Sequence, residues 1–275
     1  MEYRQFARTG EKVSVIGMGT YYDPLWIATA AILRYRRHKD RSIKAIRTGL
    51  EAGINFIDTA EIYHTEEMVG EAIKNAKRDE LFIATKVSYP YHYSYEGILR
   101  ACEGSLRRLG TSYIDLYQFH MPFRLSKIKD MMKAMEKLID SGKIRYIGVS
   151  NFSLEQMKLA MEAASKHEIV SNQVNYSLAN RQIEGSLLPF CERERIAIVA
   201  YYPLGHGKLA RESNLLKTFK EMYPEKTYAQ LALNWLISRS DVVFPIPRAS
   251  NPAHVSEDCG AAGWRMNVGS YPMER

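Results

Sequence analysis

Short apolar runs alternate along the chain with longer segments in which apolar and charged residues are mixed. The apolar runs have the length of buried strands, and the mixed segments are typical of amphipathic helices. Eight such units lie between residue 13 and about residue 262. The predicted strands are Val15–Gly19, Ile54–Ile57, Leu81–Thr85, Ile114–Phe119, Ile144–Val149, Ser171–Val174, Ile196–Ala200 and Val242–Ile246. Repeated strand–helix units predict an α/β fold with a parallel sheet.

The number of units favours a closed (β/α)8 TIM barrel over an open doubly wound sheet. No Gly-x-Gly-x-x-Gly motif follows the first strand, and chemically reactive side chains stand at the ends of many strands. Ahead of the barrel, an apolar/polar alternation broken at Thr9-Gly10 predicts a β-hairpin that we expect to cap the barrel floor. Because no linker or internal repeat interrupts the pattern, residues 1–275 are predicted to form one domain.

Composition narrows the classes of function. A chain of 275 residues that is 46% apolar has material for one large core. It has no run of about 18 apolar residues and no signal-peptide core at its start, so we predict a cytoplasmic protein without a membrane partner. The three cysteines, Cys102, Cys191 and Cys259, lack metal-ligand spacing, and no metal site is expected.

The net charge of +7 raises the possibility of a nucleic-acid partner. Lys and Arg are, however, interleaved with Asp and Glu over most of the chain, and only Arg34–Arg41 is densely basic. We interpret that run as a solvated loop or helix start and expect no nucleic-acid binding. The positive charge would still attract an anionic cofactor.

Four polar residues stand at or just past the ends of predicted strands: Asp58, Tyr63, Lys86 and His120. In a parallel barrel these ends share the face that carries chemistry. Lys86 follows an apolar run, so its ammonium is expected to be buried and paired with Asp58. Such a pair can be purely structural, but an ammonium beside Tyr63 would lower the phenol pKa and make it a proton donor. His120 could orient a carbonyl or share the proton, although a lone strand-end histidine is more often structural.

The ordered series of motifs resembles the aldo-keto reductase family along nearly the whole chain. The motifs are FIDTAEIY followed by EEMVGEAI, then IATKV, LRRLGTSYIDLYQFHMP, GKIRYIGVSNF, QVNYSL, VAYYPLGHGKL and IPRASNPAHVSED. The resemblance implies reversible, NADPH-dependent reduction of an aldehyde or ketone by hydride transfer. Residue by residue, it implies that Tyr63 is the general acid, that Lys86 and Asp58 tune it, and that His120 orients the substrate.

The resemblance also implies a cofactor site on the later strands. Ser150, Asn151 and Gln173 match the residues that bind the nicotinamide carboxamide, and Tyr201 matches the aromatic that stacks on the ring. The segment Ser150-Asn151-Phe152-Ser153 also suits a helix N-cap, and Tyr201 also suits core packing. Leu204, Gly205 and Gly207 are expected to contact the pyrophosphate. Arg248, Ser250 and Asn251 are expected to contact the adenosine 2′-phosphate, which implies NADP over NAD. Further cofactor contacts are expected from Gly19, Thr20, Asp58, His254, Glu257 and Asp258.

Two of these positions depart from the family pattern. His254 stands where many relatives carry an arginine, and Asp258 stands where an asparagine is usual. Weaker NADP binding or looser selectivity over NAD would follow.

Aromatic residues are expected to line the substrate mouth, with Tyr21, Tyr89 and Tyr91 beside His120. Such walls suit sugars, small aldehydes or aryl ketones without distinguishing them. The segment Asp23 to Asp40 is an unusual first loop and is predicted to be either a lid or a packing element. The sequence does not distinguish a monomer from a homo-oligomer.

Two other functions are alternatives to a reductase. A cofactor-binding regulatory or redox-sensing subunit, of the kind related to channel β-subunits, would share the same barrel. A metal-dependent hydrolase would need converging His and carboxylate ligands, which the motifs do not supply.

Overall fold

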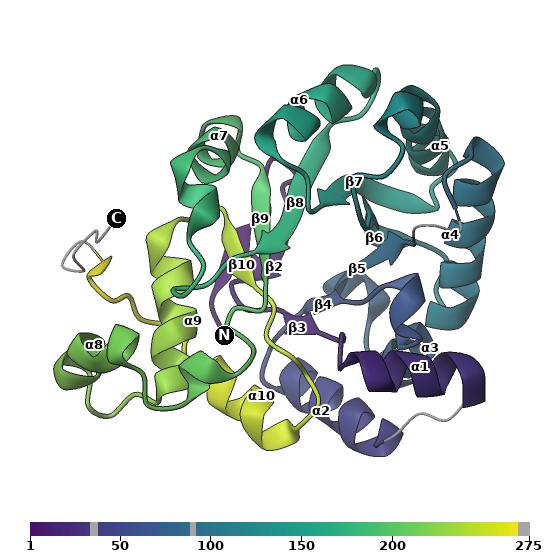
Figure 1. Ribbon diagram of the computed structural model, residues 1–275. Coiled ribbons are helices and arrows are strands. Elements are labelled where there is room, and N and C mark those ends of the chain that lie inside the picture. The colour runs from purple at the N-terminus through teal and green to yellow at the C-terminus, as the bar shows by residue number, and fades with distance from the viewer. Residues whose placement is uncertain (34–37, 89–91, 269–275) are drawn as a thin grey trace.

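The computed structural model describes residues 1–33, 38–88 and 92–268, and Figure 1 shows a ring of helices around a central sheet. The sheet has eight parallel strands in consecutive order. They are β3 (Met18–Gly19), β4 (Phe56–Asp58), β5 (Phe82–Val87), β6 (Ile114–Phe119), β7 (Ile144–Ser150), β8 (Ile169–Asn175), β9 (Ala197–Tyr201) and β10 (Val243–Pro245). Each overlaps one predicted strand, so the predicted α/β architecture is confirmed.

Helices connect the strands and cover the outside of the sheet. The α-helices are α1 (Pro24–Leu33), α2 (Lys39–Glu51), α3 (Glu66–Ile73), α4 (Tyr95–Leu109), α5 (Ile128–Asp140), α6 (Leu154–Ala163), α7 (Leu187–Glu194), α8 (Lys217–Met222), α9 (Tyr228–Arg239) and α10 (Pro252–Cys259). The short 3-10 helices are η1 (Glu61–Tyr63), η2 (Arg78–Glu80), η3 (Leu125–Lys127), η4 (Gln182–Gly185), η5 (Lys208–Ala210) and η6 (Asn214–Leu216).

The first and last strands meet and close the barrel. The amide of Gly17 donates to the Pro245 carbonyl at 2.9 Å, and the amide of Gly19 donates to the Pro247 carbonyl at 2.8 Å. A Cβ at position 19 would lie 2.8 Å from the carbonyl oxygen of Ile246. Only glycine therefore permits this approach of β3 to β10. The prediction of a closed barrel is confirmed.

The predicted N-terminal hairpin is also confirmed. Strands β1 (Tyr3–Gln5) and β2 (Lys12–Ser14) pair antiparallel ahead of the barrel. Between them, Phe6 is fully buried, and its ring centroid lies 4.7 Å from that of Phe82 and 5.0 Å from that of Phe244. The hairpin thus places an aromatic side chain among the apolar residues that fill the barrel floor.

The barrel interior changes from apolar at the floor to polar at the carboxyl ends of the strands. Side chains alternate between the two faces of a strand, so residues two apart share the interior face. Phe56, Ala84 and Leu116 belong to the interior apolar cluster. Two positions further along the same three strands stand Asp58, Lys86 and Gln118, all of them buried. This layering sets the polar site on top of a packed apolar support.

Candidate active site

The centre of the polar layer is a buried ion pair. The ammonium Nζ of Lys86 lies 2.6 Å from Oδ1 of Asp58 and donates to the carbonyl of Thr59 at 2.8 Å. The Lys86 side chain is fully buried and that of Asp58 is 3% exposed. Burial lowers the pKa of Lys86, because a low-dielectric environment disfavours the charged form, while Asp58 opposes that shift. The predicted pairing of these residues is present.

Two amides complete the environment of Asp58. Its second oxygen, Oδ2, accepts from Nε2 of Gln173 at 2.7 Å and from Nε2 of Gln118 at 3.4 Å. The carboxylate is therefore supplied with donors on both oxygens, as a buried carboxylate requires. Gln118 was not among the predicted site residues. The alternation of side chains along a strand could have identified Gln118, because it places Gln118 on the same interior face as Leu116.

Tyr63 and His120 come together above the ion pair. The phenol oxygen of Tyr63 lies 3.2 Å from Nε2 of His120. The Nζ of Lys86 lies 5.1 Å from the centroid of the Tyr63 ring. The structure thus gathers the four predicted catalytic residues at one end of the barrel, from β4, η1, β5 and the end of β6.

The prediction that the Tyr63 pKa is lowered was wrong. Burial raises the pKa of Tyr63 well above its usual range, and the nearby negative charge of Asp58 adds to the shift. Both effects disfavour a phenolate. Tyr63 is consequently a neutral phenol that keeps its proton in the resting site.

His120 is neutral as well. Burial and the positive charge of Lys86 lower the pKa of His120 to about 3. An imidazole in this state has one N–H donor and one acceptor nitrogen, so it can orient an oxygen atom but carries no spare proton. This finding removes the predicted option that His120 shares the proton load near neutral pH.

Two aromatic residues from the first loop hold Tyr63. The indole Nε1 of Trp26 donates to the backbone carbonyl of Tyr63 at 3.2 Å, and the Tyr21 ring meets the Tyr63 ring edge-on at 5.2 Å. Trp26 is 5% exposed and packs against Tyr22. These contacts support the packing interpretation of the segment from Asp23, of which residues 34–37 lie outside the described structure. Trp26 was not predicted, because no local pattern links it to Tyr63.

The predicted nicotinamide residues form one connected group. Tyr201 donates its hydroxyl to Oδ1 of Asn151 at 2.8 Å, and Nδ2 of Asn151 donates to the carbonyl of His120 at 3.1 Å. Ser150 donates its hydroxyl to the Gln173 carbonyl at 3.0 Å. The N-cap of α6 is Ser153, which forms a capping box with Gln156. The helix N-cap expected within Ser150–Ser153 is therefore confirmed at Ser153, and Ser150 and Asn151 make the other contacts described here.

The glycine loop after β9 is a chain of tight turns. Gly205 and Gly207 have φ of 54° and 85°, values that favour glycine. Their amides donate to the carbonyls of Tyr202 and Leu204 at 2.9 Å each. In this structure these two amides thus serve the turn, so the expected phosphate contact from Leu204, Gly205 and Gly207 stays a prediction.

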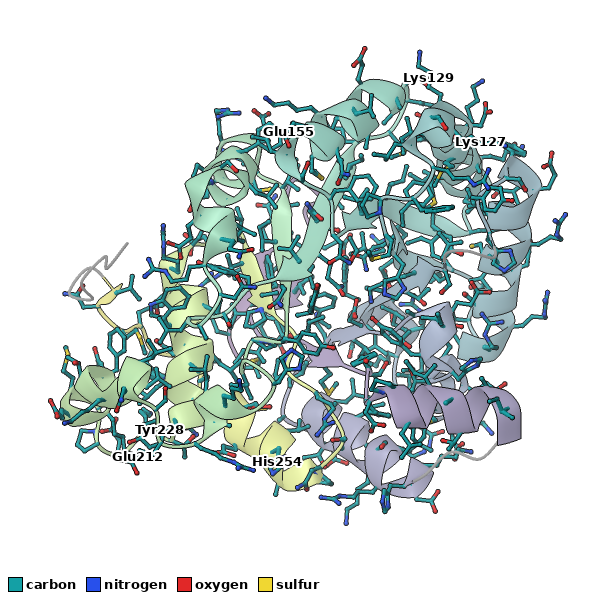
Figure 2. The ribbon with its side chains drawn as sticks, viewed as in Figure 1. Lys127, Lys129, Glu155, Glu212, Tyr228 and His254 are labelled. Atoms are coloured by element: carbon teal, nitrogen blue, oxygen red, sulfur yellow. The ribbon has the colours of Figure 1, made fainter. Side chains whose placement is uncertain are left out.

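The predicted 2′-phosphate residues lie between β10 and α10. Arg248 donates through Nη1 to the Tyr22 carbonyl at 2.9 Å. Asn251 caps α10, accepting from the amide of Ala253 at 3.2 Å, and Ser250 precedes it. His254 lies on the exposed side of α10, as Figure 2 shows. The arrangement leaves a polar helix start beside an arginine.

Further along α10, Glu257 is partly buried and Asp258 is almost fully buried. Burial raises the pKa of Asp258 to about 8, and the adjacent negative charge of Glu257 adds to it. At neutral pH the Asp258 carboxyl is therefore mostly protonated and uncharged. In charge, Asp258 thus differs little from the asparagine that is usual in the family.

The remaining predicted residues are placed as follows. Thr20 is fully buried, with its hydroxyl bonded to the Asp58 carbonyl at 3.1 Å and 2.9 Å from the hydroxyl of Thr65. The Thr20 side chain therefore contacts the backbone of Asp58. Gly19 contributes to barrel closure, as described above. Tyr89 and Tyr91 lie outside the described residues.

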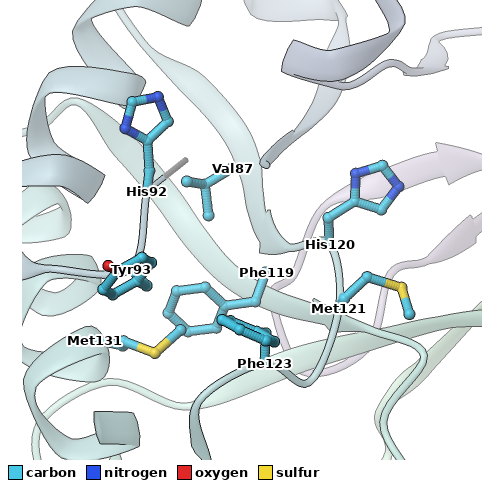
Figure 3. A pocket seen from close by; sticks show the side chains of 8 residues that line it. All are labelled: Val87, His92, Tyr93, Phe119, His120, Met121, Phe123 and Met131. Carbon is cyan, nitrogen blue, oxygen red and sulfur yellow. The ribbon is translucent and has the colours of Figure 1, made fainter. Parts of the chain in front are cut away.

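A small cavity lies beside His120 on the substrate side. It is lined by Val87, His92, Tyr93, Phe119, His120, Met121, Phe123 and Met131. Figure 3 shows His120 and Met121 on one side, Tyr93 and Met131 on the other, and Phe119 and Phe123 between them. Met121 is 46% exposed. A flexible side chain thus borders the expected substrate position.

No helix within residues 1–33, 38–88 and 92–268 is long and apolar enough to cross a membrane. The same ranges contain no group of three or more His, Cys, Asp or Glu side chains that could hold a metal ion.

A parallel (β/α)8 barrel with Asp, Lys, Tyr and His gathered at its strand ends defines a class of oxidoreductases. The model of the aldo/keto reductase family matches residues 27–266 of the chain. The chain therefore belongs to the aldo-keto reductase family.

Individual relatives agree with this assignment. The chain is 33% identical to the methylglyoxal reductase YeaE of Escherichia coli K12, over 99% of this chain and 94% of that protein. It is also 33% identical to the aldo-keto reductase YhdN of Bacillus subtilis 168, over 97% of this chain and 90% of that protein. Among solved structures, an aldo/keto reductase from Klebsiella pneumoniae in complex with NADP and acetate matches with a TM-score of 0.85 and 33% identity, covering 98% and 93% of the two chains.

Proposed function

We propose that the protein catalyses the reversible, NADPH-dependent reduction of a small-molecule aldehyde or ketone to an alcohol, with Tyr63 as general acid. The observation that carries the proposal is the contact of the Tyr63 hydroxyl with His120 at 3.2 Å, directly above the buried Lys86–Asp58 pair. This geometry favours an enzyme over the regulatory alternative, because a cofactor-sensing barrel needs no proton donor beside a neutral imidazole.

The resting protonation states suit this role. Tyr63 holds its proton because burial raises its pKa, and His120 is neutral. A carbonyl oxygen placed between these groups would accept hydrogen bonds from donors that are already oriented. As negative charge develops on that oxygen, the proton of Tyr63 transfers to it, and Lys86 stabilises the phenolate that forms. The stabilisation is greater in the transition state than in the ground state, which is what accelerates the reaction.

The residues at the ends of β7 to β9 fit a nicotinamide. Nε2 of Gln173 is committed to Asp58, which orients the amide and leaves Oε1 as an acceptor with no hydrogen bond in the described part of the chain. A carboxamide NH2 group is the complementary donor. The Tyr201 ring is half-buried and fixed through Asn151, so it presents a stable aromatic surface. A nicotinamide cofactor bound there would supply the hydride for the carbonyl carbon.

The preference for NADPH over NADH rests on α10 and on a relative. Arg248 lies just before the start of α10, and a cation beside a helix N-terminus favours a phosphate. The matching Klebsiella structures were solved with NADP and with NADPH. We therefore expect Arg248, Ser250, Asn251 and His254 to contact the 2′-phosphate, and Glu257 and Asp258 to lie toward the adenine.

The test compares oxidation of NADPH and NADH by the wild type and by Tyr63→Phe, over a panel of small aldehydes, ketones and sugars. The expected result is turnover that prefers NADPH and falls at least a hundred-fold in the variant, since general acid catalysis contributes roughly 10²–10⁴-fold. NADPH affinity, followed by fluorescence titration, should stay within about two-fold. Equal turnover in the variant would refute Tyr63 as the acid. Tight NADPH binding without turnover on any substrate would instead support the regulatory alternative.

A further inference from the structure

Tyr63 is not part of the sheet, so its position relative to Lys86 has to be set by other contacts. β4 ends at Asp58, and Tyr63 is the last residue of η1, a single 3-10 turn followed by His64 with φ of 55°. Lys86, in contrast, belongs to β5, which pairs with β4 on one side and with β6 on the other, where Lys86 itself lies opposite Gln118. A single turn outside a sheet is held only by the bonds that its own groups make.

Ser88 supplies two such bonds. Its hydroxyl Oγ accepts from the amide of Ile62 at 3.0 Å, and its own amide donates to Oε2 of Glu61 at 3.2 Å. The bonds run in opposite directions between the same two segments, so together they fix both the distance and the orientation of η1. Ser88 is 1% exposed, which shields both bonds from water.

The position of Ser88 in the chain gives the bonds their significance. Ser88 lies two residues after Lys86, directly beyond the end of β5. The turn that carries the proton donor is therefore attached to the same segment that carries the ammonium. Any shift of η1 away from β5 would lengthen both bonds and separate Tyr63 from Lys86.

Glu61 is itself held on its other oxygen. Oε1 lies 3.3 Å from Nε2 of His92 and 3.9 Å from Nη2 of Arg108. The Glu61 side chain is 19% exposed, so these contacts are only partly screened by solvent. They restrain the carboxylate from two sides and keep Oε2 directed at Ser88.

We infer that Glu61 and Ser88 form a clamp whose function is to position Tyr63 over Lys86 for proton transfer. The inference rests on the proposed function, because it requires Tyr63 to be the proton donor. Neither residue touches the reacting atoms, so both are positioning residues. A displacement of about 1 Å at a reacting group can cost on the order of a hundred-fold in rate.

The first variant is Ser88→Ala, which removes the acceptor for Ile62 and keeps the backbone amide. We expect kcat to fall about ten- to a hundred-fold, with KM and NADPH affinity within about two-fold. Ser88→Thr keeps the hydroxyl and should restore most of the rate. The matched control is Ser14→Ala, since Ser14 is a buried serine at the barrel floor that also both donates and accepts. Its kcat should stay unchanged.

A double-mutant comparison separates positioning from general loss of structure. In a Tyr63→Phe background, Ser88→Ala should leave the residual rate unchanged, because there is no longer a proton donor to position. An equal fall in both backgrounds would overturn the clamp. So would an unchanged kcat for Ser88→Ala in the wild-type background.

A second pair of variants covers the case in which Ser88→Ala does not fold. Glu61→Gln keeps an oxygen that can accept from the Ser88 amide, whereas Glu61→Ala removes it. We expect kcat of Glu61→Gln to exceed that of Glu61→Ala at least five-fold, and equal values would overturn the clamp. Failure of the proposed function is recognised separately, because Tyr63→Phe alone would then retain full turnover.

Discussion

Replacement of His120 by glutamine should change how the stability of the protein depends on pH. In the folded protein, burial and Lys86 lower the pKa of His120 to about 3, whereas an unfolded histidine has a reference value of about 6.5. Below pH 6.5 the unfolded chain therefore binds a proton at this position that the folded chain does not bind. The contribution of a neutral His120 to stability is complete above pH 6.5 and is lost as the pH falls toward 3.

The magnitude follows from the difference between the two pKa values. Each pH unit in this window costs at most about 1.4 kcal/mol, so the wild type should lose up to about 2.7 kcal/mol between pH 6 and pH 4 through His120 alone. The ring is only partly shielded in the structure, so about 2 kcal/mol is the expected value. Other titrating groups are common to both proteins and cancel in the comparison.

The assay is urea unfolding of the wild type and of His120→Gln at pH 6, 5 and 4, with the free energy of unfolding extrapolated to water. The stability difference, wild type minus variant, should become more negative by about 2 kcal/mol from pH 6 to pH 4. The matched control is His254→Gln, which makes the same replacement at an exposed histidine of α10. A constant difference for His120→Gln would refute the neutral, buried imidazole on which its proposed orienting role depends.

Three further predictions concern the barrel floor and α10. Phe6→Ala empties the centre of the floor and should lower the free energy of unfolding by about 3–5 kcal/mol, measured with urea, while NADPH affinity stays unchanged. The pKa of Asp258 is raised to about 8 in the folded protein, so between about pH 4 and pH 8 the folded chain holds a proton that the unfolded chain has lost. The wild type therefore loses stability as the pH rises through this range. In urea unfolding, Asp258→Asn should gain stability relative to the wild type over the same range, by at most about 1.4 kcal/mol per pH unit. His254→Arg should raise the ratio of NADPH to NADH affinity about ten-fold in fluorescence titrations, because a guanidinium binds a phosphate by two charge-assisted bonds; an unchanged ratio would mean that position 254 does not reach the 2′-phosphate.

Much of the fold could be predicted from local patterns. The eight predicted strands overlap the eight observed strands because a strand buried on both faces must be a short, nearly continuous apolar run. The hairpin followed from Thr9-Gly10 and the alternation around it. The tetrad could be predicted for the same reason, since polar residues at the carboxyl ends of parallel strands necessarily share one rim of the barrel.

The connections between segments could not be predicted in this way. Trp26, Gln118 and Ser88 have ordinary neighbours in the sequence, and their contacts with Tyr63, Asp58 and Glu61 span 37, 60 and 27 residues. Such contacts arise only when the barrel closes and brings consecutive strands into register.

The sequence alone determined which four polar residues stand at the strand ends and in what order, and with them the expectation that Lys86 pairs with Asp58. The tertiary structure decided the protonation states, and there the sequence-based prediction for Tyr63 had the wrong sign. A sequence indicates which charges are near one another, but a pKa depends on how much water the folded chain removes from each group. Burial raises the pKa of Tyr63 in the same direction as Asp58, and it lowers the pKa of His120 in the same direction as Lys86. This burial exists only once the barrel is closed.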